Sequence, residues 1–253
     1  MVAHGAQPDA CFDALNVTSR DLVREVHASF VEAGAQVIET NTFGANRYKL
    51  AAHGFGGRVR EINVAGAARA REAGARIVAG SVGPLGVRLA PYGRVSKHDA
   101  RAAFAEQISA LAEGGVDLIL LETHSDLAEL EQAVLAAREA CSLPVIATVT
   151  FTRDDRTVLG ETPAMAGALL ASLGVDAMGV NCSEGPDQVL RALTAMKPEA
   201  NGIPLVAQPN AGGPQRLAAR IMYSAAPEYL ADHGDDADHA RTCASRNAHR
   251  YRR

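Results

Sequence analysis

The sequence predicts an α/β fold in which short parallel strands alternate with helices, and a (β/α)8 TIM-type barrel is the architecture that fits it best. From Ser19 to about Leu205, β-branched runs alternate with Ala- and Leu-rich helical periods, the pattern of successive βα units. The 253 residues and their 47% hydrophobic content are enough for one large core, and barrels of this length are common. Polar or glycine-containing clusters follow each strand.

The elements are expected in a regular order. An opening helix at about Arg20–Ala33, with Thr18 or Ser19 as its N-cap, leads into a strand at Gln36–Asn41. Gly34 and Gly74 end the first two helices. Further helices are predicted at 59–73, 97–113, 126–140, 162–173 and 187–196, and further strands at 76–80, 117–122, 144–150, 175–181 and 204–208. Six strands are therefore expected, all in the same phase.

The polar clusters after the strands indicate where a site would form. In a barrel the carboxyl ends of the strands share one rim, so residues far apart in the sequence converge there. A doubly wound open sheet is the competing architecture, and it also binds ligands at the carboxyl ends of its strands. The phosphate-binding patterns GxGxxG and GxxxxGK[ST] follow none of the strands, which favours the barrel.

Composition narrows the class of protein. The net charge of -4 and the pI near 6.1 do not favour nucleic acid as a partner. The sequence has no apolar run of about 18 residues for crossing a membrane, and its N-terminus lacks the pattern of a secretory signal. We therefore expect a cytoplasmic protein. The cysteines, which are widely spaced, are expected to be free thiols or metal ligands rather than a disulfide framework: Cys11, Cys141, Cys182 and Cys243.

Cys182 is the sharpest single candidate for chemistry, because the strand before it delivers it to the predicted rim and Ser183–Pro186 then turn the chain. A thiolate in that place binds zinc or acts as a nucleophile. A half-buried structural cysteine is the alternative. One cysteine cannot hold zinc by itself.

Glu122 ends an otherwise apolar strand, where a carboxylate is costly to bury unless it meets a cation. It would suit an ammonium group, and a salt bridge to a neighbouring Arg or Lys is the alternative. Glu39 is a similar candidate for a buried acid, with a structural hydrogen-bonding role as its alternative. His124 beside Glu122 is a candidate base, although a single histidine without an orienting partner is more often structural.

Three asparagines follow strands at the same predicted rim: Asn41, Asn181 and Asn210. Their side chains are able to orient a substrate carboxylate or the rim loops by hydrogen bonding. Asparagine is also simply a good turn residue. For each one taken alone, the turn role is the simpler interpretation.

Six strings, in this order and at these spacings, closely resemble the homocysteine-binding domain of homocysteine S-methyltransferases, particularly the bacterial type fused to a methylenetetrahydrofolate reductase. The strings are CFDALN (Cys11–Asn16), ETNTFGAN (Glu39–Asn46), GSVGPLG (Gly80–Gly86), ETHSDLAELE (Glu122–Glu131), GVNCSEGP (Gly179–Pro186) and PNAG (Pro209–Gly212). The resemblance covers about Pro8 to Leu230, and none of the strings is decisive alone.

The resemblance implies a (β/α)8 barrel in which three cysteine thiolates hold Zn²⁺ and the sulfur of homocysteine takes the open position. The thiolate of homocysteine then takes a methyl group to give methionine. Cys182 matches the first zinc cysteine, and Glu122 matches the acid that receives the amino group of homocysteine. The segment Thr40, Asn41 and Thr42 lies where the family contacts the amino-acid part of the substrate, and Asn181 precedes the zinc cysteine. Methyltetrahydrofolate, betaine and S-methylmethionine are the family's methyl donors.

Two departures from the family pattern indicate an incomplete barrel, with strands 2 to 7 recognisable and strands 1 and 8 missing. Strand 1 should precede Cys11, and a last strand with a Gly-Gly-Cys-Cys-Gly-Thr sequence should follow Tyr229. We therefore expect a barrel domain over 1–231 and a disordered tail over 232–253. Cys243 is the only cysteine downstream of Cys182. A frameshift near Ala231 is one hypothesis for the tail.

The sequence leaves three functions open. The first is zinc-dependent methyl transfer to homocysteine, with Glu122 as the catalytic acid site and an oligomer or a fused or partner reductase as associated features. The second is a non-catalytic remnant or binding subunit that keeps part of the amino-acid pocket but lacks a complete zinc site. A barrel enzyme of unrelated, metal-free chemistry at Glu122 is a third.

Overall fold

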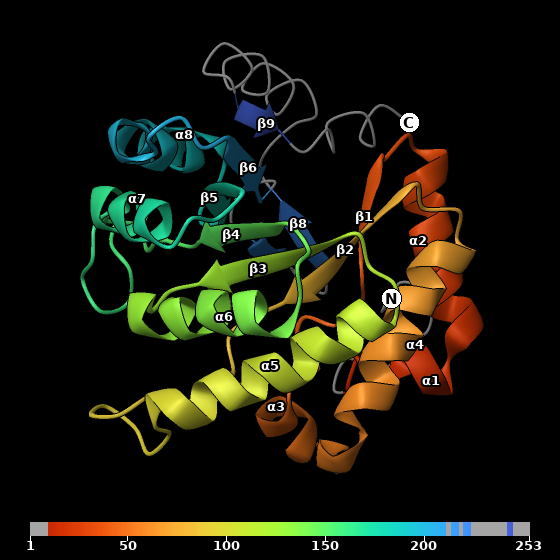
Figure 1. Cartoon of the computed structure of the whole chain (residues 1–253). Coiled ribbons are helices and arrows are strands. Elements are labelled where there is room, and N and C mark those ends of the chain that lie inside the picture. The colour runs from red at the N-terminus through yellow and green to blue at the C-terminus, as the bar shows by residue number, and fades with distance from the viewer. Residues whose placement is uncertain (1–9, 211–213, 218–219, 224–241, 245–253) are drawn as a thin grey trace. The chain divides into compact units, whose positions relative to one another are not determined.

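A computed structural model describes residues 10–210, 214–217, 220–223 and 242–244 of the chain (Figure 1). The chain divides into two compact units, Met1–Glu122 with Ala128–Val145 (unit 1) and Thr123–Leu127 with Ile146–Arg253 (unit 2). Within the described residues, no helix is long and apolar enough to cross a membrane.

Unit 1 is built from parallel strands that alternate with helices. Its strands lie in the order β1, β2, β3, and β2 pairs in parallel with both neighbours. Helices α2 and α5 pack on either side of α4 (Figure 1). The elements are α1 (Leu15–Thr18), α2 (Arg20–Glu32), β1 (Val37–Glu39), α3 (Arg47–Ala51), the 3-10 turn Gly56–Arg58, α4 (Val59–Glu72), β2 (Ile77–Val82), α5 (Lys97–Glu113), β3 (Leu118–His124) and α6 (Leu127–Ala140), the last two of which cross the boundary with unit 2.

Unit 2 repeats the pattern. Its strands lie in the order β4, β5, β6, β9, all parallel, while β7 and β8 form a separate antiparallel pair. Helices α7 and α8 pack against each other (Figure 1). The elements are β4 (Val145–Val149), α7 (Pro163–Ser172), β5 (Ala177–Cys182), α8 (Pro186–Met196), the 3-10 turn Lys197–Glu199, β6 (Leu205–Pro209), β7 (Pro214–Leu217), β8 (Arg220–Tyr223) and β9 (Thr242–Ala244).

The two faces of each set of strands differ. Side chains alternate between faces along a strand. In unit 1 one face carries Ile38, Val78 and Leu121, all buried; Gly80 of the same face lies against Leu111 and Val116. In unit 2 the helix-covered face carries six buried apolar side chains: Ala147, Val149, Met178, Val180, Leu205 and Ala207. The opposite face carries Glu39, Ser81 and Glu122 in unit 1 and Asn181 in unit 2.

The predicted elements are confirmed. All six predicted strands and all six predicted helices are present, and most of their ends agree within about two residues, the accuracy with which element ends are defined at all. The structure therefore has the α/β architecture of an incomplete barrel. Ser19 does occupy the N-cap of α2, although its side chain makes no capping hydrogen bond. The short helices α1 and α3 and the strands β7, β8 and β9 were not predicted.

The predicted domain boundary at Ala231 lies outside the described residues, as does most of the segment 232–253. Within that segment Thr242–Ala244 form β9, whose residues pair with Leu205–Ala207 of β6.

Candidate functional site

Three polar side chains of unit 1 share the face of the strands opposite the helices, and we call them the acid site: Glu39, Ser81 and Glu122. Glu39 pairs with Ala79 of β2, and Ser81 pairs with Leu120 of β3. Because side chains two residues apart point to the same face, Glu39, Ser81 and Glu122 must project together. Parallel pairing thus gathers residues that are widely separated in the sequence.

Glu122 has a carboxyl group that its surroundings perturb strongly. Burial, followed by the negative charge of Glu39, raises the pKa of Glu122 from an ordinary 4.5 to about 7. The Ser81 hydroxyl donates a hydrogen bond of 2.5 Å to Glu122 Oε1, which opposes that rise. Near neutral pH this carboxyl group is therefore only partly ionised, and a cation placed beside it would favour its charged form.

Glu39 corrects one expectation, because its side chain is exposed rather than buried. In unit 1, β1 is the first strand of the order and lies next to β2. Its residues Val37 and Glu39 are both exposed. The charge of Glu39 still acts on Glu122. Glu39 thus keeps a solvated charge near the buried acid.

Thr40 and Thr42 are buried, and their hydroxyl groups are used within the protein. The two hydroxyl oxygens lie 2.6 Å apart; Thr42 Oγ1 also donates to the carbonyl oxygen of Ser81, and Thr40 Oγ1 accepts from the Ser81 amide. Gln107 Nε2 donates to the carbonyl oxygen of Thr42 at 2.7 Å. These residues hold the backbone of Ser81, and through it the hydroxyl that contacts Glu122.

The side chain of Asn41 is directed instead toward the segment Phe12–Asn16. Its Nδ2 donates to the carbonyl oxygen of Phe12 at 2.6 Å and to Asn16 Oδ1 at 3.1 Å. Asn41 also lines a cavity of about 460 Å³ whose wall includes Asp13 and Lys49. Burial raises the pKa of Asp13 and lowers that of Lys49.

The thiol candidate lies in unit 2, at the start of a segment that we call the thiol loop, residues 182–185. Cys182 and Ser183 have φ angles of 54° and 55°, in the left-handed region that side chains other than glycine rarely adopt. Thr123 has a φ of 63°, which is rarer still for a β-branched residue. Such conformations persist only where the surrounding structure imposes them.

Asn181 is the polar centre around Cys182. Its side chain is 2% exposed. Its Oδ1 accepts from the Thr123 amide at 2.9 Å and from Thr148 Oγ1 at 3.0 Å, and its Nδ2 donates to Thr123 Oγ1 at 2.6 Å and to the Cys182 sulfur at 3.5 Å. Thr123 Oγ1 lies 3.8 Å from the same sulfur. The amide of Asn181 therefore fixes both Thr123 and the thiol.

Neighbouring rim segments fasten the thiol loop further. Ser183 donates its amide to Thr150 Oγ1, and its hydroxyl accepts from the Phe151 amide, each at 3.3 Å. Asn210, at the end of β6, donates its amide to the carbonyl oxygen of Cys182 and its Nδ2 to that of Ser183. Asn210 thus has the loop-orienting role that was one of its two predicted interpretations.

The remaining candidates have structural positions. His124 is fully buried, and its backbone carbonyl accepts from Thr150. Cys11, Cys141 and Cys182 are not joined in disulfides, which is compatible with both of their predicted roles, free thiol and metal ligand. Among the residues that the structure describes, no group of three or more His, Cys, Asp or Glu side chains is arranged to hold a metal ion.

Sequence reasoning missed Ser81, Thr123 and Thr148. Ser81 directly follows the strand predicted at 76–80, and the strand pairing alone would have placed it on the face of Glu122. Thr123 carries no sequence signal for its left-handed backbone, since threonine disfavours it. The contacts of Thr148 with Asn181 depend on the register of β4 and β5, which only the fold supplies.

Taken together, the fold and these sites define an α/β protein of the incomplete-barrel type, with a perturbed acid and a restrained thiol at the carboxyl ends of its strands. Residues 3–246 match the family model described as homocysteine S-methyltransferase. The chain therefore belongs to the homocysteine S-methyltransferase family, the resemblance found in its motifs. The match extends beyond the predicted domain end at 231.

Relatives support this membership. The chain is 35% identical to the methionine synthase of Mycobacterium tuberculosis and 33% identical to that of Mycobacterium leprae, in alignments 237 positions long that cover 88% of this chain and 20% of each relative. The chain thus spans about a fifth of their length. The oxidized form of the homocysteine methyltransferase MmuM from Escherichia coli superposes with a TM-score of 0.78 at 24% identity, over 96% of this chain and 85% of that one. This likeness shows the shared fold.

Proposed function

We propose that this chain binds homocysteine and serves the transfer of a methyl group to its thiol, giving methionine. The observation that carries the proposal is Glu122: a buried carboxyl group with a pKa near 7, on the polar face of the strands, in a member of this family. A group of this kind favours a cationic partner, and the α-ammonium group of an amino acid is one.

Each residue of the acid site has a proposed role. Glu122 receives the ammonium group of homocysteine in its ionised form, and the Ser81 hydroxyl fixes the orientation of the carboxylate. Glu39 adds negative charge on the same face. Thr40, Asn41 and Thr42 are proposed to shape the substrate pocket by holding the backbone around it, since their side-chain hydrogen bonds go to the protein.

In unit 2, we propose that Cys182 is this chain's thiolate ligand for zinc, and that Asn181 serves the site by orienting Cys182 and Thr123. Zinc lowers the pKa of a bound thiol. Among the described residues, no group of three or more His, Cys, Asp or Glu side chains that could hold a metal ion includes Cys182. We propose that the methyl group comes from a donor of the class that includes methyltetrahydrofolate, betaine and S-methylmethionine.

Calorimetric titration of the chain with homocysteine tests the role of Glu122. We expect binding to weaken about tenfold for each pH unit below 7, because the carboxyl group must lose its proton to accept the ammonium group. Glu122→Gln should weaken binding and abolish this dependence. Glu106→Gln, at an exposed glutamate paired with Arg47, is the matched control and should bind as the parent does. Parent-like binding by Glu122→Gln would sink the assignment.

A binding domain without catalysis is the second candidate function, favoured by the absence of a three-ligand cluster among the described residues. It would bind homocysteine but would neither retain zinc nor transfer methyl groups. Zinc content per purified chain, measured beside methyl transfer, separates the two. If the chain is the enzyme, Cys182→Ser should abolish transfer and lower the zinc content while leaving the fold intact.

A further inference from the structure

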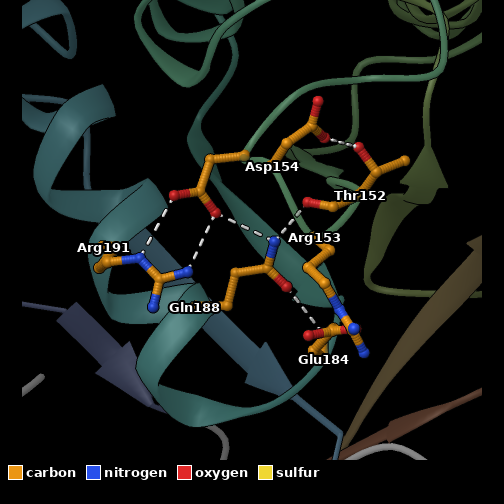
Figure 2. Close-up of polar contacts among 7 residues, drawn as sticks. Thr152, Arg153, Asp154, Glu184, Gln188 and Arg191 are labelled. Atoms are coloured by element: carbon orange, nitrogen blue, oxygen red, sulfur yellow. Dashed lines mark hydrogen bonds and ion pairs between the residues drawn. The ribbon is translucent and has the colours of Figure 1, made fainter.

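Gln188 joins two loops of unit 2 while belonging to neither of them (Figure 2). It is the third residue of α8 and is 4% exposed. Its Oε1 accepts from the Glu184 amide at 2.8 Å, and its Nε2 donates to the carbonyl oxygen of Thr152 at 2.5 Å and to Asp155 Oδ1 at 3.0 Å. Both amide donors and the amide acceptor are used, so this buried group is matched to the two loops.

The position of Gln188 on the helix explains its reach toward the thiol loop. In a capping box, the side chain of the third helical residue accepts from the backbone amide of the N-cap. Here the N-cap is Gly185, and Gln188 reaches one residue further back, to Glu184. The end of the thiol loop is thereby tied to the first turn of α8.

The partner of Gln188 in the other loop is itself anchored. Asp155 has a left-handed φ of 56°, and its two carboxylate oxygens accept from Arg191, each at 3.3 Å. Arg191 lies one turn after Gln188 on α8. The loop between β4 and α7 is thus held to the same helix as the thiol loop, at two points.

The hydrogen bonds of Gln188 help to stabilise an unfavourable backbone conformation in the thiol loop. Its first two residues, Cys182 and Ser183, have left-handed backbones, which cost free energy and persist only where several contacts impose them. Ser183 also bonds Thr150 and Phe151, which begin the loop that Gln188 holds at Thr152. Loss of the Gln188 hydrogen bonds would therefore loosen both the thiol loop and the loop between β4 and α7 that contacts it.

We propose that Gln188 is a positioning residue that holds the thiol loop, and with it Cys182, in the left-handed conformation by clamping it to the loop between β4 and α7. Its importance for methyl transfer rests on the function proposed above, whereas the clamp itself is a property of the fold. The test is therefore a measurement that does not depend on catalysis.

Residue-resolved hydrogen exchange by NMR provides that measurement. In Gln188→Leu, we expect the amides of Ser183 and Asn210 to exchange at least about fivefold faster, the factor that corresponds to one lost hydrogen bond. Gln188 touches neither amide. If its role were only to cap Glu184, the Glu184 amide alone would respond, and that result would overturn the proposal.

Gln132→Leu is the matched control. Gln132 is a buried glutamine on α6 that accepts from Arg101 and donates to Glu131. Its substitution also removes a buried amide and lowers stability, but it should leave the ratio of exchange between Ser183 and the rest of unit 2 unchanged. An equal loosening of the thiol loop in both variants would mean that Gln188 has no specific role.

A pair of substitutions at Gln188 and Asp155 keeps the proposal testable should the leucine variant fail to fold. Gln188→Glu sets a carboxylate oxygen against Asp155, so exchange at Ser183 should rise as in the leucine variant. Adding Asp155→Asn restores a donor opposite that carboxylate and should slow exchange again by about fivefold. Side chains that act only by filling space would show no such recovery, and its absence would contradict the clamp.

Discussion

The acid site of unit 1 and the thiol loop of unit 2 prepare their groups in different ways. Glu122 is perturbed by its surroundings: burial and the charge of Glu39 raise its pKa, and one hydroxyl group opposes them. Cys182 is restrained by hydrogen bonds and backbone conformation, through Asn181, Ser183 and Asn210. The unfavourable free energy of the acid site is thus electrostatic, whereas that of the thiol loop is conformational.

The difference teaches what each region needs from a ligand. A cation beside Glu122 would relieve the cost of ionising a buried acid, so binding and proton release are coupled there. The thiol loop gains nothing comparable from a charge, because its cost lies in φ angles that the protein already imposes. Substitutions should therefore show strong pH dependence in the acid site and weak pH dependence in the thiol loop.

The largest effect is expected at Gly179, in the strand that leads to the thiol loop. A Cβ atom there would lie 1.9 Å from the carbonyl oxygen of Val206, so Gly179→Ala must displace β6 from β5. We expect a loss above about 4 kcal/mol in the free energy of unfolding, measured by urea denaturation. Gly80→Ala in β2 is the control, since a Cβ there meets only side chains, at 3.2 Å and beyond. Equal costs would contradict this account.

Asn181→Leu should have the next largest effect. It leaves the Thr123 amide and the Thr148 hydroxyl without their buried acceptor, which should cost about 2 to 4 kcal/mol. The loss should be the same at pH 5 and pH 8, because no charge is involved. Thermal and urea unfolding at the two pH values check this. A loss that depends on pH would contradict the claim that the thiol loop, unlike the acid site, is held without charge.

Glu122→Gln should stabilise the protein, but only at high pH. The folded-state pKa near 7 lies above the ordinary 4.5, so the carboxyl group costs the folded state nothing below pH 4.5. The cost grows as the pH rises from 4.5 to about 7, and it is fully present above that. Removing the charge should therefore add roughly 1 to 3 kcal/mol at pH 8 and almost nothing at pH 4. Urea denaturation across this range decides, and a pH-independent gain would refute the electrostatic account.

The smallest effect is expected at Arg153, whose exposed guanidinium group pairs with Glu184 of the thiol loop. Arg153→Ala should change the free energy of unfolding by less than about 0.5 kcal/mol, as exposed ion pairs contribute little. Hydrogen exchange at Ser183 should stay at its parental rate. A loosened loop in this variant would transfer the positioning role from Gln188 to the ion pair.

Much of the fold was predictable from local pattern. The alternation of β-branched and Ala-rich segments predicted the helices at 97–113 and 127–140 closely, since burial of one face requires that periodicity. The β7 and β8 pair and β9 were missed, because segments such as Thr242–Ala244 have no pattern apart from the strand they pair with. Glu122 and Cys182 were found from their places after apolar strands. Gln188 was not, since its sequence neighbours are those of any helix start.

By itself, the sequence determined the order of the βα units, the family, and the residue types at the strand ends, because each of these depends on neighbours along the chain. The tertiary structure decided the ionisation of Glu122, the exposure of Glu39 and the left-handed backbone of Cys182. Those properties arise from strand register and from contacts between loops that are distant in the sequence. A carboxyl group or a thiol has its chemistry set by what the fold places beside it.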